Sequence, residues 1–202
     1  MNSIDQVRTA LTSYDFLPLN IGTNNQAAVA IILRARNDQI EVLLIERARH
    51  KDDPWSGQMA FPGGRRDPED LSARAAAERE TQEELGVSLA SAQFLGRIDE
   101  LQGRHSGRSI DLVISPFVYF LDHEVVIAPN YEVADTVWVS FSILQDVKYQ
   151  IIHVYDRENN RTHPGIRLGE SDGRIVWGLT YRFLGIFFSI IGRPLPEMQS
   201  LG

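Results

Sequence analysis

Two apolar segments joined by a short polar stretch constrain the fold of this chain more than any other feature. Residues 27–33 are continuously apolar, and residues 40–45 are mostly apolar and rich in β-branched side chains. Between them stands Asn37-Asp38, a pair of residue types that favours a tight turn between two strands. The pattern therefore predicts a buried β-hairpin.

The start of the chain is typical of a short amphipathic helix. Ile4, Val7 and Leu11 recur at helical spacing after Ser3. Gln6 stands three residues after Ser3, which is the spacing of a capping box. The interruption of any apolar core by charged residues argues against a secretory signal peptide here.

Two further segments favour helix. Residues 70–85 are rich in alanine, glutamate and arginine, and Gly86 is well placed to end that helix in a left-handed conformation. Residues 177–191 are mostly apolar but include Arg182, and they are fewer than the roughly 20 residues that a membrane span needs. We expect this second helix to pack on the core.

Three later segments are predicted strands: residues 93–98, 110–121 and 136–139. Pro116 lies inside the second of them, so we expect that strand to lie at a sheet edge or to carry a bulge. Residues 51–70, rich in proline, glycine and charge, form a long connection, which is typical of a functional or a mobile loop.

Composition narrows the class of protein. With 202 residues, of which 43% are hydrophobic and 23% charged, the chain is expected to form one ordinary globular domain. The absence of cysteine excludes disulfides, thiolate metal sites and a thiol nucleophile, and it favours a cytoplasmic location. The net charge of −7 argues against bulk electrostatic binding to nucleic acid or to an anionic membrane.

That charge is concentrated in one stretch. Residues 67–84 contain seven acidic side chains against two arginines, a net charge of −5. The preceding residues 47–66 reverse the sign, because Arg47, Arg49 and three other basic residues outweigh Asp52 and Asp53. A basic segment that runs into an acidic one is the feature that a function must explain.

Three of the acidic residues share one face of the predicted helix. Glu80, Glu83 and Glu84 are three and four residues apart, and like charges at this spacing repel one another. Arg79 can pair with one of them, whereas a divalent cation could neutralise more. Carboxylate oxygens suit Mg²⁺ or Mn²⁺, so the two interpretations that spacing leaves open are a metal site and a solvated charged face.

The residues before and within this helix carry a resemblance to a known family. Phe61-Pro62-Gly63-Gly64, followed by the Arg-Glu-Thr-Gln-Glu-Glu-Leu-Gly-Val of residues 79–87, closely resembles the signature of the Nudix hydrolases. Two positions depart from that signature. Asp70 stands for the family's first glutamate, with eight rather than seven residues before Arg79, and Thr81 stands where an aliphatic residue is usual.

The resemblance extends beyond the signature. Residues 43–48, with Gly57 and the following Phe61-Pro62-Gly63-Gly64, are similar to the corresponding element of the coenzyme A pyrophosphatase branch, although Asp52 and Asp53 occupy the place of an arginine. Residues 174–180 also resemble that branch. The likeness spans residues 27–191 and suggests a lead-in at 1–26, a hydrolase domain at 27–192 and a tail at 193–202.

The resemblance implies an α/β fold, an α/β/α sandwich around a mixed sheet, in which the signature forms a loop–helix–loop. It implies hydrolysis of a nucleoside diphosphate derivative with Mg²⁺ or Mn²⁺ as cofactor. Metal ligation is then assigned to the side chains of Glu80, Glu83 and Glu84 and to the Gly64 carbonyl. Arg79 would orient the glutamates, and Glu80 and Glu83 are candidates for the general base.

Other residues have weaker claims. Arg47 and Arg49, and also Arg104 and Arg108 around a glycine-containing turn, could bind substrate phosphates. Trp55 could stack on an adenine or anchor its loop, and Glu132 is a further candidate carboxylate. The histidines show no metal-ligand spacing and are interpreted as surface or loop residues: His50, His105, His123, His153 and His163.

The resulting hypothesis is a hydrolase of the pyrophosphate bond in coenzyme A or acyl-coenzyme A. Two alternatives stay open: hydrolysis of another nucleotide derivative, such as ADP-ribose or a dinucleotide, and a non-catalytic Nudix module that senses a nucleotide. The expected partner is a small nucleotide-type substrate rather than nucleic acid or membrane. The sequence leaves homodimer formation open.

Overall fold

The computed structural model describes residues 3–22, 24–51, 55–105, 108–156, 161–170 and 172–196, with the backbone alone described at residues 104, 105, 108, 109 and 156. Within these ranges no helix is both long enough and apolar enough to cross a membrane.

The larger sheet is mixed. Its strands in the described ranges are β1 (Gln26–Arg36), β2 (Gln39–Arg47), β3 (Met59–Ala60), β4 (Gly63–Arg65), β5 (Gln93–Arg97), β6 (Leu101–His105), β7 (Arg108–Leu121) and β8 (Val133–Ser140). The order is β3-β2-β1-β7-β5, while β4 pairs with β1, β6 with β7 and β8 with β2. β1 and β7 run parallel and form the centre of the sheet.

The predicted hairpin is confirmed. β1 and β2 pair in antiparallel register up to Arg36 and Gln39. Asn37 and Asp38 both have positive φ, 50° and 58°, as a two-residue turn of this type requires. Successive side chains of β1 enter cores on opposite faces of the sheet, which explains why residues 27–33 are continuously apolar.

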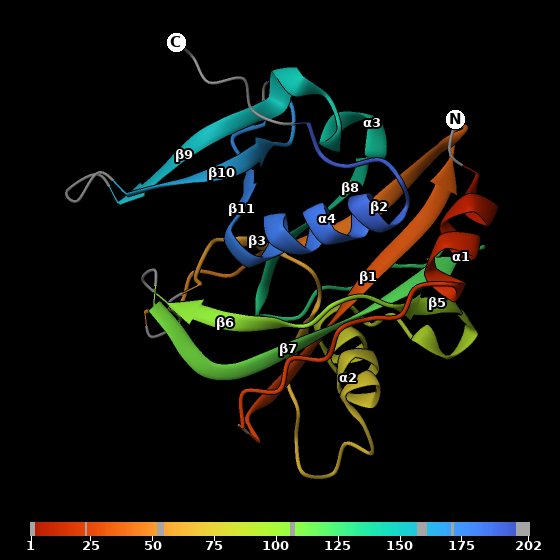
Figure 1. The fold of residues 1–202 in the computed structure, drawn as a ribbon, viewed down its shortest axis with the longest axis vertical. Coiled ribbons are helices and arrows are strands. Elements are labelled where there is room, and N and C mark those ends of the chain that lie inside the picture. The colour runs from red at the N-terminus through yellow and green to blue at the C-terminus, as the bar shows by residue number, and fades with distance from the viewer. Residues whose placement is uncertain are drawn as a thin grey trace.

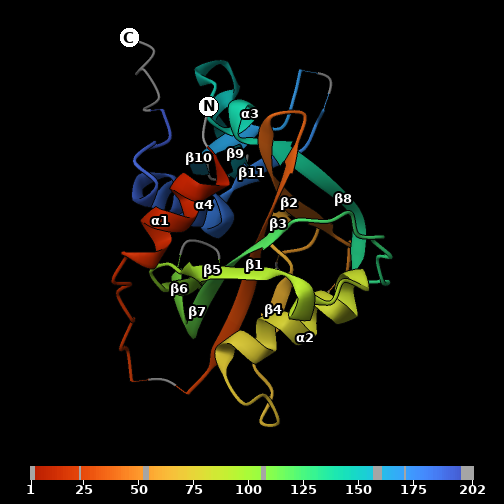
Figure 2. The ribbon, with the colours of Figure 1, turned by 90° about the vertical axis from the view of Figure 1, so that its right-hand side faces the viewer.

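Helices cover both faces of this sheet (Figures 1 and 2). α2 (Ala73–Leu85) packs on one face through Ala76, Ala77 and Leu85. α1 (Ile4–Thr12) and α4 (Gly178–Ile190) contribute to the core on the other face. The expected α/β/α sandwich is therefore confirmed. The remaining helical turns are η1 (Leu89–Ser91), α3 (Phe141–Leu144) and η2 (Val147–Tyr149).

A second sheet was not predicted. It is made of β9 (Gln150–Asp156), β10 (Arg161–Arg167) and β11 (Ile175–Trp177), in the order β11-β10-β9, and all its pairs are antiparallel. Figure 1 shows β9 and β10 extending past the first turn of α4. A hydrogen bond of 2.9 Å from the Thr180 hydroxyl to the Met59 carbonyl ties the start of α4 to β3.

Of the two alternatives predicted from Pro116, the edge position is wrong, because β7 lies inside the sheet. The irregular strand is confirmed, since β7 steps from Val113 to Ser109 while β6 steps only from Gln102 to Arg104, although this irregularity does not include Pro116. On that side of β7, β6 pairs as far as Ile114 and β5 from Phe117 onwards. The Pro116 carbonyl accepts a 3.4 Å bond from Ile98 N on the same side. Proline has no backbone N–H, and an N–H at this position would point to the same side, into the gap between the end of β6 and the start of β5. Pro116 therefore costs the sheet no hydrogen bond between strands.

Two helix starts also differ from expectation. The helix predicted from residue 70 begins at Ala73, because the Ser72 side chain caps it by accepting from Ala75 N. The capping box predicted at Ser3 is absent, since the Ser3 side chain makes no capping hydrogen bond and only its carbonyl accepts from Gln6 N. The helix at 177–191 is confirmed as α4.

Candidate active site

The ends of α2 fix where its glutamates lie. Ser72 caps the first turn, and Gly86 ends the helix with φ of 69°, where its N–H donates to the Gln82 carbonyl. Glu80 and Glu84 are one turn apart on this helix. Both side chains line a cleft on the larger sheet, beside the loop that leads from β3 to β4.

Glu84 is a buried carboxylate with one strong partner. The residue is 2% exposed, and Gly63 N donates to Oε2 at 2.8 Å. Burial raises the pKa of its carboxyl to about 7, against the opposing effect of the Gly63 hydrogen bond. The nearby charges of Glu80 and Glu132 raise that pKa further. A buried anion in this setting is suited to binding a cation.

Gly63 and Gly64 let the backbone approach both α2 and β1. A Cβ atom at Gly63 would lie 2.2 Å from the Ala28 carbonyl oxygen, and the φ of Gly63 is 146°. A Cβ atom at Gly64 would lie 2.5 Å from the carboxylate of Glu80. The double glycine therefore leaves the space in which the Glu80 carboxylate lies against β4.

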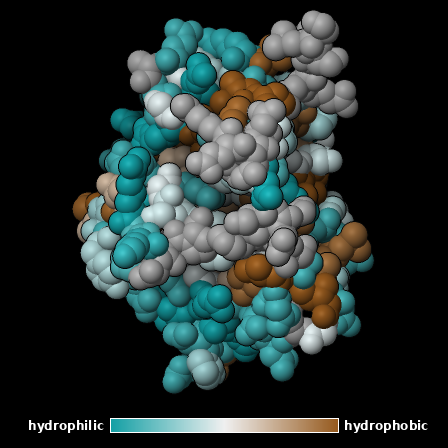
Figure 3. Space-filling model, turned by 90° about the vertical axis from the view of Figure 1, so that its left-hand side faces the viewer, coloured by the Kyte–Doolittle hydropathy of each residue, from teal (hydrophilic) through white to brown (hydrophobic). Residues whose placement is uncertain are grey.

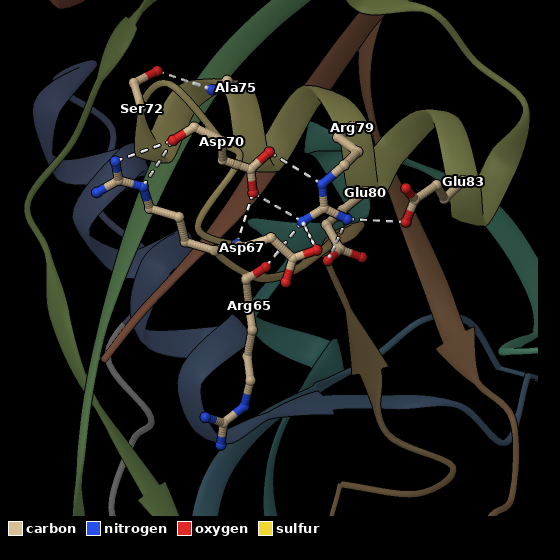
Figure 4. A network of polar contacts seen from close by, with 9 residues as sticks. Arg65, Asp67, Asp70, Ser72, Ala75, Arg79, Glu80 and Glu83 are labelled. Atoms are coloured by element: carbon tan, nitrogen blue, oxygen red, sulfur yellow. Dashed lines mark hydrogen bonds and ion pairs between the residues drawn. The ribbon is translucent and has the colours of Figure 1, made fainter. Parts of the chain in front are cut away.

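Arg79 joins the helix to the preceding loop (Figure 4). It donates from Nε to Asp70 Oδ1 at 3.1 Å and from Nη2 to Asp70 Oδ2 at 3.0 Å. Nη2 also donates to the Arg65 carbonyl at 3.0 Å, and Nη1 reaches Glu80 at 3.1 Å and Glu83 at 3.0 Å. Asp70 is thus the main anchor of the arginine that contacts both glutamates.

The electrostatics of this pair follow from the geometry. The hydrogen bond from Arg79 lowers the pKa of the Asp70 carboxyl, and the same bond raises the pKa of Arg79. Asp70 Oδ2 also accepts from Asp67 N at 2.8 Å, so the carboxylate organises the loop as well as the helix.

The structure separates the three signature glutamates. Glu80 and Glu84 line the cleft, whereas Glu83 is not among the lining residues and its side chain is 54% exposed. Burial raises the pKa of Glu80 although Arg79 opposes this. Thr81 is buried, and its hydroxyl donates to the Ala77 carbonyl at 2.7 Å, which satisfies a polar group where an aliphatic one is usual.

The cleft has a volume of about 1160 Å³ and is bordered by both sheets and by the start of α4. Five arginines line it, two of which were predicted as phosphate ligands: Arg47, Arg49, Arg65, Arg174 and Arg182. Trp55 and Glu132 line it too. Figure 3 shows the face of the molecule toward which β9 and β10 extend, which is mainly hydrophilic with separate hydrophobic patches.

Metal binding rests on few protein ligands. In the described part of the chain, no three His, Asp or Glu side chains are grouped closely enough to hold an ion alone. The pair formed by Glu80 and Glu84 nevertheless fits Mg²⁺, which usually takes one or two carboxylates together with water and substrate oxygens. Glu84 is buried and Glu80 partly buried, and the charge of Glu80 raises the pKa of the Glu84 carboxyl, so a cation between the two carboxylates is favoured.

Some site residues were missed or lie beyond the description. His153 and His163, interpreted as surface or loop residues, stand in strands β9 and β10 rather than in loops and are partly exposed where they line the cleft. The β-branched and aromatic residues of 150–156 were the signal for a strand here. The side chains of Arg104 and Arg108, and that of His105, lie outside the described part.

Comparison with known proteins agrees with this geometry. A model of the NUDIX domain matches residues 24–157. An uncharacterized Nudix hydrolase, NudL, of Yersinia pestis is 30% identical over 161 residues, which cover 78% of this chain and 75% of that protein. An uncharacterized protein of Schizosaccharomyces pombe is 40% identical over 106 residues, but the match covers 46% of this chain and only 32% of that protein.

A solved structure shares the fold. The crystal structure of a MutT/nudix family protein from Enterococcus faecalis aligns with a TM-score of 0.56 and 17% sequence identity, covering 95% of this chain and 70% of that one. With the domain matched over residues 24–157 and a relative aligned over most of both chains, this chain belongs to the Nudix family, whose hydrolases act on pyrophosphate bonds.

Proposed function

We propose that the protein hydrolyses the pyrophosphate bond of coenzyme A or acyl-coenzyme A with Mg²⁺ or Mn²⁺, giving 3′,5′-adenosine bisphosphate and 4′-phosphopantetheine. The observation that carries this proposal is a pair of carboxylates, Glu80 and Glu84, in a cleft lined by five arginines. A diphosphate needs positive charge around its oxygens and a cation between it and the glutamates. The proposed catalytic domain comprises residues 27–192.

The signature residues would hold the metal. We assign ligation to the side chains of Glu80 and Glu84 and to the Gly64 carbonyl, and we assign Glu83 a share of a second ion. When bound, the metal supplies Lewis-acid polarisation of phosphate oxygens and a lowered pKa for a water ligand. The burial of Glu84 supports its role, because a carboxylate held in place by Gly63 N is already oriented.

Arg79 is a positioning residue in this proposal. Its guanidinium contacts Glu80 and Glu83 through one nitrogen and Asp70 through the other two. It therefore restricts the rotamers of both glutamates. The Arg47 and Arg49 side chains, at the end of β2 and in the following loop, would bind substrate phosphates, and we assign Arg104 and Arg108 the same role.

The general base is assigned to a carboxylate near the attacking water. Glu80 and Glu83 belong to the signature. Glu132 is the third candidate, since it lines the same cleft and its charge raises the pKa of both Glu80 and Glu84. Replacing each of the three by glutamine and measuring the pH profile of kcat identifies the base as the residue whose loss removes the ascending limb.

Coenzyme A is favoured over simpler nucleotides by the positive charge in the cleft. Its adenosine carries a 3′-phosphate in addition to the diphosphate, so more arginines are needed to bind it. Arg174 is held by Asp172 and Asp135, whereas Arg47, Arg49, Arg65 and Arg182 add further charge along the cleft. The resemblance of residues 43–64 and 174–180 to the coenzyme A branch supports the same substrate.

A panel of substrates tests the proposal. The protein is incubated with Mg²⁺ and coenzyme A, acetyl-coenzyme A, ADP-ribose or a diadenosine polyphosphate, and the products are resolved by mass spectrometry. We expect 3′,5′-adenosine bisphosphate from the first two. Cleavage of ADP-ribose or the dinucleotide while coenzyme A survives would replace the proposed substrate by another nucleotide derivative. Binding without any cleavage would identify a nucleotide-sensing module instead.

A further inference from the structure

The second sheet carries four aromatic rings to which the signature assigns no role. His153 and Tyr155 come from β9, His163 from β10 and Trp177 from the end of β11. The Tyr155 ring centroid lies 5.0 Å from that of His163 and 5.2 Å from that of Trp177, with interplanar angles of 27° and 23°. The His153 centroid lies 5.0 Å from that of Trp177. We call these four rings the aromatic surface.

Strand alternation places the aromatic surface away from the core. In β10 and β11, Ile166 pairs with Val176, so both side chains are on one face of the sheet. Both are fully buried in the core that also contains Phe183 of α4. His163 and Trp177, which alternate with them, are consequently on the opposite face.

The opposite face borders the cleft. All four rings line it, together with Glu80 and Glu84, and all four residues are only partly buried. Burial and the neighbouring His163 lower the pKa of His153, so at neutral pH this imidazole is mainly an uncharged ring. A packed aromatic core would be fully buried, whereas these rings are partly exposed to the open cleft.

We propose that the aromatic surface stacks against the purine base of the substrate, while the diphosphate lies along the arginines toward Glu80 and Glu84. This inference rests on the proposed function in one respect, that the substrate is a nucleotide. Bases stack on aromatic side chains through their π-faces, and the loss of one such side chain weakens binding by about tenfold or more. Tyr155 and Trp177, the two largest rings, are then the residues that select for a base.

Binding of AMP and of ribose 5-phosphate tests the proposal without turnover. Both probes carry the same phosphate and sugar, and only AMP carries the base. Titration calorimetry of the metal-free protein is expected to give tighter binding of AMP for the wild type. Trp177→Leu and Tyr155→Leu are expected to weaken AMP binding about tenfold each and to leave ribose 5-phosphate unchanged. Tyr155→Phe, which keeps the ring, is expected to bind AMP as the wild type does.

A matched control separates stacking from general damage. Trp138→Leu removes the same side chain from β8, where Trp138 packs under Arg34 and does not line the cleft. It is expected to leave AMP binding unchanged, and thermal unfolding of each variant shows that the fold is retained. If Trp177→Leu fails to fold, the comparison of Tyr155→Leu with Tyr155→Phe still shows whether AMP binding needs an aromatic ring on this surface.

Two outcomes overturn the inference: AMP affinity that survives loss of both rings, or equal losses for AMP and ribose 5-phosphate. Neither outcome depends on coenzyme A being the substrate. If the substrate panel shows no cleavage of coenzyme A while AMP binding still requires Trp177, the proposed substrate fails and the aromatic surface remains a base-binding site.

Discussion

At the scale of single residues, the two departures from the Nudix signature have physical explanations. Asp70, shorter by one methylene than glutamate, still reaches Arg79 with both oxygens, although eight rather than seven residues separate the two. The Thr81 hydroxyl donates to the Ala77 carbonyl, so this buried hydroxyl is paired. The resemblance alone could identify these positions, but only the contacts show why they are tolerated.

The Asp70–Arg79 pair predicts a pH dependence of stability. Because Arg79 lowers the pKa of the Asp70 carboxyl in the folded protein, the unfolded chain binds its proton more tightly. The stability from this pair is therefore present above the unfolded pKa, near 4, and is lost as the pH falls through the lower folded pKa. The free energy of unfolding, measured with urea between pH 5 and pH 3, should fall less steeply with pH in Asp70→Asn than in the wild type. We call this fall the acid limb.

The exposed neighbour Glu69 provides the control for that experiment. Glu69→Gln is expected to keep the acid limb of the wild type, since the residue makes no contact with Arg79 among those described. An unchanged limb in Asp70→Asn would show that the pair contributes nothing to stability above pH 4.

The burial of Glu84 predicts that loss of its charge raises stability without metal and lowers activity with metal. Its charge is buried and repelled by Glu80 and Glu132, so removing the charge should stabilise the protein without metal. Glu84→Gln keeps the volume and an oxygen for Gly63 N. In EDTA its Tm should rise by about 2–4 °C for each kcal/mol gained. With Mg²⁺, hydrolysis measured by product formation should fall by about a hundredfold or more.

Glu83 serves as the comparison. Its side chain is 54% exposed, so Glu83→Gln should leave the Tm in EDTA nearly unchanged. A clear drop in Tm for Glu84→Gln would mean that the carboxylate is stabilising even without metal, contrary to the electrostatic argument.

At the scale of elements, local patterns predicted well at turns and helix ends. Asn37-Asp38 indicated the hairpin turn, and Gly86 indicated the end of α2. For Pro116 only the edge-strand alternative failed, because the tolerance of this proline inside the sheet depends on where two other strands, β5 and β6, begin and end. The short strands β3 and β4 have little periodicity of their own and form only because β1 and β2 offer them partners.

The double glycine between β3 and α2 predicts two distinct variants. Gly63→Ala places a methyl group 2.2 Å from a backbone oxygen of β1 at a φ of 146°, so the fold itself should be strongly destabilised. Gly64→Ala meets only the movable carboxylate of Glu80 at 2.5 Å. It should lower kcat several-fold while the Tm stays close to that of the wild type.

Thermal unfolding and steady-state kinetics of the two variants check this contrast. The prediction is that Gly63→Ala has the lower Tm of the two variants, whatever the size of the difference. If Gly64→Ala unfolds as readily as Gly63→Ala, the glycine is needed for the backbone rather than for the position of Glu80.

At the scale of the whole molecule, the cleft joins residues that no local pattern could bring together. Arg47, Glu84, His163 and Arg182 all line it, and the hydrogen bond between α4 and β3 joins residues 121 positions apart in the chain. The spacing of His153 and His163 in the sequence therefore gave no sign that both line one cleft. The resemblance to a family predicted the sandwich and placed the signature on it, while the second sheet and its aromatic surface required the structure.

The concentration of negative charge in residues 67–84 couples metal binding to global unfolding. The folded chain brings Glu80 and Glu84 together, and the unfolded chain does not, so a cation that binds this pair stabilises the fold by mass action. At a free Mg²⁺ concentration of 100 times Kd, this amounts to about 2.7 kcal/mol. For a protein of this size we expect a Tm increase of roughly 5–10 °C.

Differential scanning calorimetry with MgCl2, against NaCl of equal ionic strength, measures that increase. Glu80→Gln and Glu84→Gln should lose most of it, because each removes one of the two carboxylates proposed to bind the cation. Glu124→Gln, an exposed change outside the cleft, should retain it. Since Glu84→Gln also raises the Tm in EDTA, the decisive quantity is the difference between the two buffers rather than either Tm. An equal difference in all four proteins would place the metal elsewhere and would leave the burial of Glu84 without a cation to explain it.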